Sequence, residues 1–199
     1  MIYEQPPCEE YVSYYQPGGY HPVHLGDTFH NDTYQVVHKL GYGQSSTVWL
    51  VKDRKRGGYA SMKILAAIAP TSEVDVLRHI QRNGSTSSGG SEFILQLIDE
   101  FEHSGPNGVH RCIISEVFGP PLSSDIEELY PDEEYPIGIA KRISSQIAHG
   151  LEYLHSCGVV HGGRSFTYQY FVCLTHRAHR RSSSQKHTCP FTINRLLVF

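Results

Sequence analysis

The chain has 199 residues, of which 39% are hydrophobic and 19% charged, and its formal net charge is −3. This composition is typical of a soluble globular protein, and no apolar run approaches the roughly 18 residues that a membrane-spanning helix needs. Residues 1–10 have neither a basic start nor an apolar stretch, so we expect an intracellular protein of the cytoplasm, the nucleus or both. The 5 cysteines include no Cys-x-x-Cys pair, so neither a disulfide framework nor a zinc site is indicated and free thiols are expected.

The charge is unevenly distributed along the chain. Residues 1–163 carry 20 acidic and 11 basic side chains, a net charge of −9, whereas residues 164–199 carry 6 basic side chains and no acidic one, a net charge of +6. We therefore expect residues 164–199 to be different material from the rest, a basic tail that is disordered or misread.

Residues 1–30 predict an extended N-terminal arm. The part from Glu9 to Phe29 is rich in Tyr, Pro and Gly and has no sustained hydrophobic period. Turns are expected at Pro17-Gly18-Gly19 and Leu25-Gly26-Asp27. We expect the tyrosines of this arm to pack on a sheet.

A glycine hairpin follows the arm. Gly41 and Gly43 lie between two segments rich in β-formers, Tyr34 to Leu40 and Thr47 to Val51. Missing Cβ atoms would let the backbone N–H groups approach phosphate oxygens, so this stretch favours a hairpin folded over a nucleotide. An ordinary glycine turn is the alternative, because Ser46 stands where such loops usually carry a third glycine.

The next apolar run carries a lysine. Arg54 to Gly58 predicts a charged hairpin turn, and the run from Tyr59 to Ile64 that follows it contains Lys63. Its ammonium group would reach the same phosphates from the sheet below, which is the arrangement of a protein-kinase Gly-rich loop and its strand lysine.

Several of these segments together resemble one family. The start of SR-protein kinases and their fungal relatives is similar to Tyr15-Gln16-Pro17-Gly18-Gly19-Tyr20-His21-Pro22-Val23, Gly26-Asp27, Tyr34, Leu40-Gly41-Tyr42-Gly43 and Ser46-Thr47-Val48-Trp49-Leu50. The resemblance covers the chain from about Tyr11 to Gly163. It implies an α+β protein-kinase fold, serine/threonine kinase activity, ATP and Mg²⁺ as cofactors, and Arg/Ser-rich protein substrates.

A short amphipathic helix is predicted from Thr71 to Ile80, where apolar residues recur at helical spacing. The resemblance implies that Glu73 pairs with Lys63 and holds it against the phosphates. Asp75 is the alternative partner, and a solvated helix carboxylate is the alternative for either residue.

Two further strands are predicted after the loop from Asn83 to Ser91. They run from Phe93 to Phe101 and from Val109 to Val117, on either side of a turn at Ser104 to Gly108. Counted from Tyr34, this makes five strands and one helix, the content of a kinase small lobe over residues 31–119.

The resemblance also implies an adenine-binding hinge from Glu116 to Gly119. Residues 120–163 are then a partial large lobe, with an acidic segment from Asp125 to Glu134 that contains one short helix. Its field would attract an Arg-rich substrate, although a solvated face is the reading that we prefer. Apolar residues at helical spacing predict a helix from Ile137 to Ser156, ended by Gly158.

The catalytic loop lacks its acid. Kinases carry an Asp two residues after the loop His, but here His161 is followed by Gly162 and Gly163, and no Asp or Glu occurs after Glu152. Loss of the general base alone costs about 10² to 10⁴ in rate, and absent Mg²⁺ ligands remove further charge stabilisation. We therefore assign no catalytic residue and no metal ligand, and predict no useful turnover.

The tail from Arg164 to Phe199 does not resemble the missing lobe, which suggests translation through an unspliced or misread part of the gene. A nucleic-acid-binding tail is the competing idea, but basic and aromatic residues are not interleaved as in known modules, and we expect no direct nucleic-acid partner. Arg180 to Ser184 is a candidate phosphorylation site.

The sequence as a whole predicts a truncated, inactive fragment of an SR-protein-kinase-like enzyme that retains its ATP site. A non-catalytic, pseudokinase-like module that binds nucleotide or protein is the alternative, and an unstable product without a function of its own is a third reading. The candidate nucleotide-binding residues are Leu40, Gly41, Gly43, Val48, Lys63, Glu73, Glu116 and Phe118.

Overall fold

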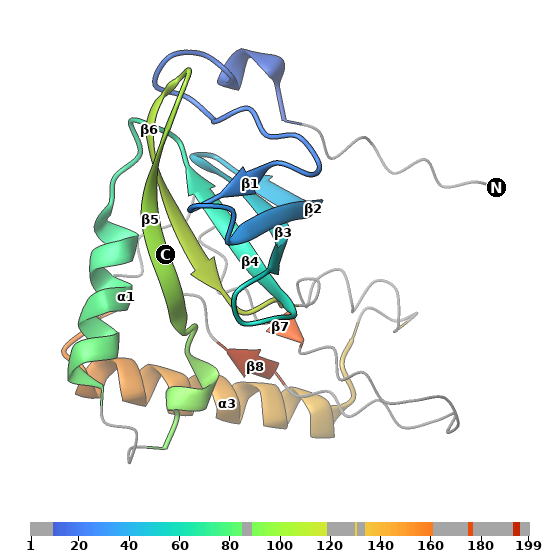
Figure 1. Cartoon of the computed structure of the whole chain (residues 1–199). Helices are drawn as coiled ribbons and strands as arrows, with labels where there is room; N and C mark the ends of the chain where they lie inside the picture. Colours follow the sequence, from blue (N-terminus) through green and yellow to red (C-terminus); the bar gives the residue numbers. More distant parts are fainter. Residues whose placement is uncertain are drawn as a thin grey trace. The chain divides into compact units, whose positions relative to one another are not determined.

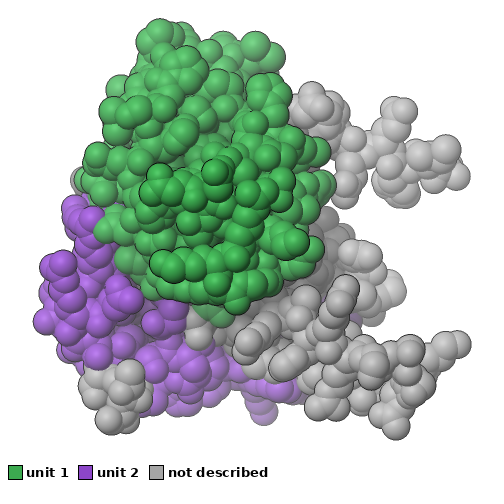
Figure 2. All heavy atoms as spheres, in the orientation of Figure 1, with its two compact units in different colours: residues 1–71, 97–117 green, residues 72–96, 118–199 purple. Residues whose placement is uncertain are grey.

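A computed structural model of the protein describes residues 10–84, 89–118, 130, 134–160, 175–176 and 193–195 (Figure 1). The chain divides into two compact units (Figure 2). Unit 1 comprises residues 1–71 and 97–117, and unit 2 comprises residues 72–96 and 118–199. Within the described ranges, no helix combines the length and the hydrophobicity that crossing a membrane requires.

Unit 1 is built on a six-stranded antiparallel sheet with the strand order β1-β2-β3-β4-β6-β5 (Figure 1). Its elements are η1 (Val12–Tyr14), β1 (Thr28–Phe29), β2 (Tyr34–Gly43), β3 (Ser46–Asp53), β4 (Tyr59–Leu65), β5 (Leu97–Gly105) and β6 (Gly108–Ser115). The five strands predicted from Tyr34 onward are confirmed. β1 was missed because two residues are too few to show a period.

One face of this sheet carries the hydrophobic core of unit 1. Trp49, Met62 and Ile114 lie directly opposite one another on β3, β4 and β6, and all three are buried. Side chains of a strand alternate between the two faces, so the residues before and after each of these three on its own strand point to the other face. The buried members of the core are Phe29, Tyr34, Val36, Trp49, Val51, Ala60, Met62, Ile64, Phe101, Cys112 and Ile114.

The turn between β3 and β4 is closed by a carboxylate. Asp53 accepts hydrogen bonds from the backbone N–H groups of Lys55 at 2.9 Å and Arg56 at 2.8 Å, as aspartate does in tight turns. Gly57 and Gly58 adopt positive φ angles of 78° and 90°, which L side chains rarely adopt. The hairpin turn predicted at Arg54 to Gly58 is confirmed.

The N-terminal arm is fastened to the sheet through its backbone. The N–H of Gly18 donates to the carbonyl of Asn107 at 2.7 Å, and the N–H groups of Ala67 and Ile68 donate to the carbonyls of Gly19 and Gly18, each at 3.0 Å. Figure 1 shows the arm in dark blue at the tip of the β5–β6 hairpin. The tyrosine packing expected of the arm is thus joined by main-chain hydrogen bonds that its sequence did not predict.

Three histidines meet where the arm crosses β5 and β6. The ring of His21 lies 4.5 Å from that of His103 and 5.1 Å from that of His110, between ring centroids. His110 is fully buried, and its Nδ1 donates to the carbonyl of Leu65 at 2.9 Å. Burial and the two neighbouring imidazoles lower the pKa of His21 to about 4, against a weaker opposing effect of Asp27. Burial and His110 also lower the pKa of His103.

This cluster predicts that acid destabilises the protein. An unfolded histidine titrates near 6.5, so between that pH and about 4 the unfolded chain binds more protons than the folded one. The stabilisation is complete above pH 6.5 and is lost as the pH falls toward 4, by up to about 1.4 kcal/mol per pH unit for each proton difference. Urea unfolding at pH 7.5, 6 and 5 measures it.

Two matched variants distinguish the contribution of the histidine cluster to the pH dependence of stability from the contribution of groups elsewhere. His103→Gln is expected to reduce the pH dependence, because it removes one of the shifted imidazoles. His38→Gln, which changes an exposed histidine of β2, is expected to leave the pH dependence as it is. A free energy of unfolding that stays flat from pH 7.5 to 5 would contradict the role of the cluster.

Unit 2 is mainly helical in the part that the structure describes. Its elements are α1 (Ser72–Asn83), η2 (Ser91–Phe93), α3 (Ile137–Ser156), β7 (Thr175–His176) and β8 (Ile193–Arg195), the last two paired antiparallel. The helices predicted from Thr71 and from Ile137 are confirmed, and α3 has the predicted bounds. A second hydrophobic cluster joins α1, the segment after η2 and α3, through the buried residues Ile80, Ile94, Tyr153, Leu154 and Cys157.

The predicted start of the fourth strand at Phe93 was wrong, because that strand, β5, begins only at Leu97. Phe93 ends the short helix η2, and Ile94 is fully buried in the cluster of unit 2. The side-chain amide of Gln96 donates to the carbonyls of Ser91 and Ile94, both at 3.2 Å, so it takes up carbonyls that a sheet ladder would otherwise need. Local apolarity alone did not distinguish a buried turn from a strand.

The prediction of free thiols can be checked at two of the cysteines. Cys112 and Cys157 are free buried thiols, as predicted, and burial raises the pKa of Cys112 to about 12. Other predictions fall on residues that the structure does not describe. The segment 161–164 with Gly163, the hinge residue Gly119 and most of the acidic segment lie outside the described residues, as do Cys8, Cys173 and Cys189.

Candidate functional site

The glycine hairpin is formed by β2 and β3. Gly41 pairs with Val48 and Gly43 with Ser46, and the chain turns through residues 44–45. A β-bulge between Lys39 and Gly41 makes Leu40 the extra residue of β2, and its side chain is 43% exposed. The predicted hairpin is therefore present, with Leu40 beside its first glycine.

The two glycines are not required by the fold of the hairpin itself. Neither has a positive φ angle. A Cβ atom added to Gly41 would meet nothing within 4 Å, and one added to Gly43 would meet only the Oγ of Ser46, at 3.6 Å. Glycine inside a strand weakens it and often marks a place where a ligand approaches the backbone closely. The open space at Gly41 leaves room for such an approach.

A row of directly opposite residues leads from this glycine to the predicted lysine. Gly41 lies opposite Val48 on β3, Val48 opposite Lys63 on β4, and Lys63 opposite Ile113 on β6. Opposite residues of antiparallel strands share a face, which here is the face away from the Trp49 core. The structure thus places Gly41, Val48 and Lys63 in one row on this face.

The end of β6 lies on the same face. Ser61 is two residues before Lys63 on β4 and pairs with Ser115, the last residue of β6. Glu116 follows directly, and the hydroxyl of Ser115 donates to its carbonyl at 3.3 Å. The start of the predicted hinge is therefore placed in unit 1, at the end of the strand that borders Lys63.

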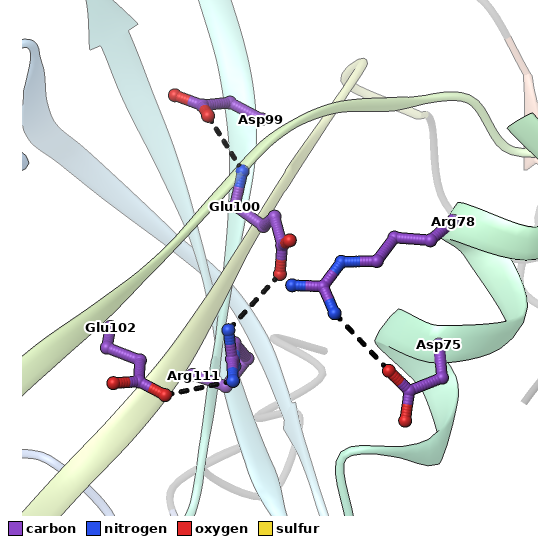
Figure 3. Close-up of polar contacts among 6 residues, drawn as sticks. All are labelled: Asp75, Arg78, Asp99, Glu100, Glu102 and Arg111. Atoms are coloured by element: carbon purple, nitrogen blue, oxygen red, sulfur yellow. Dashed lines mark hydrogen bonds and ion pairs between the residues drawn. The ribbon is translucent and has the colours of Figure 1, made fainter. Parts of the chain in front are cut away.

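Glu73 and Phe118 belong to unit 2, so their predicted roles toward Lys63 and the hinge stay predictions. Glu73 lies in the first turn of α1. The alternative partner, Asp75, forms an ion pair with Arg78 one turn along α1, with 3.3 Å between the Arg78 Nη1 and the Asp75 Oδ1 (Figure 3). Asp75 is therefore already engaged within its own helix.

The carboxylates of β5 on the face of Lys63 are paired with an arginine. Arg111 contacts Glu102 at 2.9 Å and Glu100 at 3.4 Å (Figure 3). Glu100 lies opposite Ile113, in the same row as Lys63. Arg111 therefore offsets negative charge on the face that would receive an anion. The neighbouring Asp99 points elsewhere, to the backbone N–H of Glu100 at 2.8 Å and the hydroxyl of Tyr34 at 2.7 Å.

Contacts between the arm and the hairpin were missed by sequence reasoning. The hydroxyl of Tyr20 donates to the carbonyl of Gly43. Lys39, at the root of the hairpin, forms an ion pair with Glu10, and its Nζ lies 5.4 Å from the ring centroid of Trp49. The abundance of tyrosine in the arm is the signal that pointed to such packing, but no sequence pattern identifies the partner atoms.

The hydrogen bonds around Glu10 set its charge state. Burial raises the pKa of Glu10, but the hydrogen bonds from Lys39 and Tyr15 outweigh burial, so the net pKa is lowered. Burial and the Glu10 carboxylate in turn raise the pKa of Tyr15. Glu10 is therefore ionised, and the Tyr15 hydroxyl protonated, at neutral pH.

Comparison with known proteins gives a consistent family. The pattern of the "Protein kinase domain" family matches residues 34–162. The chain is 40% identical over 158 residues to "Protein kinase dsk1" of Schizosaccharomyces pombe, which covers 77% of this chain and 29% of that protein. It is 39% identical over 161 residues to "Serine/threonine-protein kinase SKY1" of Saccharomyces cerevisiae, covering 77% and 22%.

A human protein gives a similar match. "SRSF protein kinase 3" of Homo sapiens is 41% identical over 153 residues, covering 74% of this chain and 26% of that protein. The chain therefore spans less than a third of the length of these curated relatives.

Proposed function

The chain belongs to the SR-protein kinase family, and on this premise we propose that it carries the ATP-binding part of a serine/threonine protein kinase. The observation that carries the proposal is the row of Gly41, Val48 and Lys63, with open space where a side chain on Gly41 would lie. A nucleotide fits this arrangement, because phosphate oxygens need close backbone N–H groups and a cation on the same face.

Each residue of the row has a role toward ATP. The backbone N–H groups of the hairpin approach the phosphates, Val48 covers the nucleotide, and the ammonium group of Lys63 binds the phosphates. The backbone of Glu116, at the end of β6, hydrogen-bonds the adenine edge in this proposal, and the roles of Glu73 and Phe118 stay predictions. Protein kinases use ATP together with Mg²⁺, which would offset the negative charge of the phosphates.

Gly41→Ala tests the proposal, because it separates nucleotide binding from stability. The added methyl group meets no atom of the protein within 4 Å, so the free energy of unfolding is expected to stay the same or rise by about 0.5 kcal/mol. The same methyl group occupies the space of the approaching phosphates, and the Kd for Mg-ATP is expected to rise about tenfold. Isothermal titration calorimetry and urea unfolding measure the two effects.

Gly138→Ala is the matched control. Gly138 is an exposed glycine of α3 whose added Cβ also meets nothing within 4 Å, and it lies in the other unit. This variant is expected to bind Mg-ATP like the wild type. If Gly41→Ala also bound Mg-ATP like the wild type, the open space at the hairpin would have no bearing on nucleotide binding and the proposal would lose its support.

We expect no phosphoryl transfer by this 199-residue chain. Gly163 stands where kinases carry the general base, and the sequence has no carboxylate after Glu152 to bind Mg²⁺. An Arg/Ser-rich peptide incubated with the chain and labelled ATP is therefore expected to gain no label above a Lys63→Met background. Label that appears with the wild type and disappears with Lys63→Met would refute the argument from Gly163.

The substrate class and the location are further parts of the proposal. Arg/Ser-rich proteins are proposed as substrates of the kinase type to which the chain belongs, because one relative is named an SRSF protein kinase. An intracellular site of action, in the cytoplasm or the nucleus, is part of the same proposal.

A further inference from the structure

We propose that Tyr20 is a positioning residue for nucleotide binding. Its hydroxyl holds the peptide group between Gly43 and Gln44 in the orientation that presents the hairpin N–H groups to phosphate. The inference rests on the proposed ATP site and adds the N-terminal arm to it as the part that fixes the hairpin tip.

Tyr20 is built to act as a fixed hydrogen-bond donor. Its side chain is 2% exposed, and its ring packs edge to face against Tyr14 at 5.3 Å and Tyr15 at 5.7 Å between centroids. Burial, and after it the neighbouring Tyr14 and Glu10, raise its pKa to about 12. The phenol is therefore protonated at neutral pH and donates to the carbonyl of Gly43.

Peptide planarity transmits this contact to the N–H of Gln44. The carbonyl of Gly43 and the N–H of Gln44 belong to one planar trans peptide group, so they point in opposite directions. When Tyr20 binds the carbonyl, the Gln44 N–H is directed away from the arm. Glycine has wide backbone freedom, so this peptide would rotate more freely without the tether.

The arm is itself anchored, so the Tyr20 hydroxyl is a fixed point. The Nδ2 of Asn107, at the tip of the β5–β6 hairpin, donates to the carbonyl of Tyr20 at 2.6 Å. A second fastening lies just beyond Gln44, where the N–H of Ala66 donates to the carbonyl of Ser45 at 2.8 Å. The tip is thus held on both sides of Gln44, at Gly43 by the arm and at Ser45 by the end of β4.

Tyr20→Phe tests the inference, because it removes the hydroxyl and keeps the ring packing. In the full chain, the Kd for Mg-ATP is expected to rise about three- to tenfold, the effect of one lost hydrogen bond. Backbone amides of residues 41–46 are expected to exchange their hydrogens faster in the nucleotide-free protein. Asn107→Ala, which loosens the anchor of Tyr20 from the other side, is expected to shift both readouts in the same direction.

Tyr34→Phe is the matched control. It removes a hydroxyl that is bonded to Asp99 at 2.7 Å, on the same sheet but at the other end of β2 from the hairpin tip. It is expected to lower the stability of the protein comparably while leaving the Kd for Mg-ATP and the exchange of residues 41–46 unchanged.

The outcomes distinguish the positioning role of Tyr20 from the ATP site on which it depends. Wild-type affinity in Tyr20→Phe overturns the positioning role of Tyr20 and leaves the ATP site in place. An equal loss of affinity in Tyr20→Phe and Tyr34→Phe also overturns it, because the effect would then be one of general stability. A wild-type chain that binds no Mg-ATP overturns the proposed function and this inference together.

Discussion

Replacing Lys63 with methionine is expected to abolish most of the thermal stabilisation that Mg-ATP gives to the chain. The ammonium group supplies charge-assisted hydrogen bonds to phosphate, each worth about 1.5 to 3 kcal/mol, so its loss should weaken binding about ten- to hundredfold. Methionine keeps the length and the apolar stem of the side chain, so the strand should stay intact. Thermal unfolding with and without Mg-ATP measures the difference, since a ligand stabilises only the fold that binds it.

Lys52→Met is the control for this experiment. Lys52 lies on β3 next to the core strand β4, but its side chain is exposed and it pairs with Tyr59 at the far end of both strands from the hairpin. The same loss of charge there is expected to leave the ATP-induced stabilisation unchanged. Equal stabilisation of the wild type and Lys63→Met by Mg-ATP would place the phosphates elsewhere.

Leu154→Ala is expected to cause the largest loss of stability in unit 2. Leu154 is fully buried on α3, in the cluster that includes Ile80 of α1 and Ile94. Truncating a buried leucine leaves a cavity and costs about 2 to 5 kcal/mol, a large part of the roughly 5 to 15 kcal/mol that holds a typical domain folded. Urea unfolding followed by far-ultraviolet circular dichroism should show a lower midpoint.

Ile137→Ala on the same helix is its control. Ile137 begins α3 and is 72% exposed, so its truncation is expected to change the free energy of unfolding by less than about 0.5 kcal/mol. If both variants unfolded at the wild-type midpoint, α3 would not be packed in the cluster that joins it to α1.

The strands and helices were predictable where the spacing of apolar residues agreed with the positions of turn-forming residues. α3 was found with its full bounds because apolar residues recur along it and Gly158, with a positive φ angle of 75°, ends it. The β3–β4 turn was found because Arg54 to Gly58 is charged and ends in two glycines. The prediction of a strand over Phe93 to Gln96 failed, because a short apolar run does not reveal whether it joins a sheet or packs on a helix.

The candidate site was predictable only in part, for a similar reason. Gly41 and Lys63 are recognisable because spacing along the chain carries their roles. The contact of Tyr20 with Gly43 joins residues 23 positions apart through one hydroxyl, and no local pattern encodes it. The burial of His110 beneath the arm is likewise a product of tertiary packing, since an isolated histidine in a strand has no distinctive period.

Trp49 is an intrinsic fluorescence probe of unit 1. It is the sole tryptophan of the sequence, it is 5% exposed, and its Nε1 donates to the Thr47 hydroxyl at 3.0 Å within the hairpin strand β3. Intrinsic emission on excitation of tryptophan therefore arises from unit 1 alone. Far-ultraviolet ellipticity follows the helices of unit 2 as well, so a gap between the fluorescence and the ellipticity curves would reveal two separate transitions.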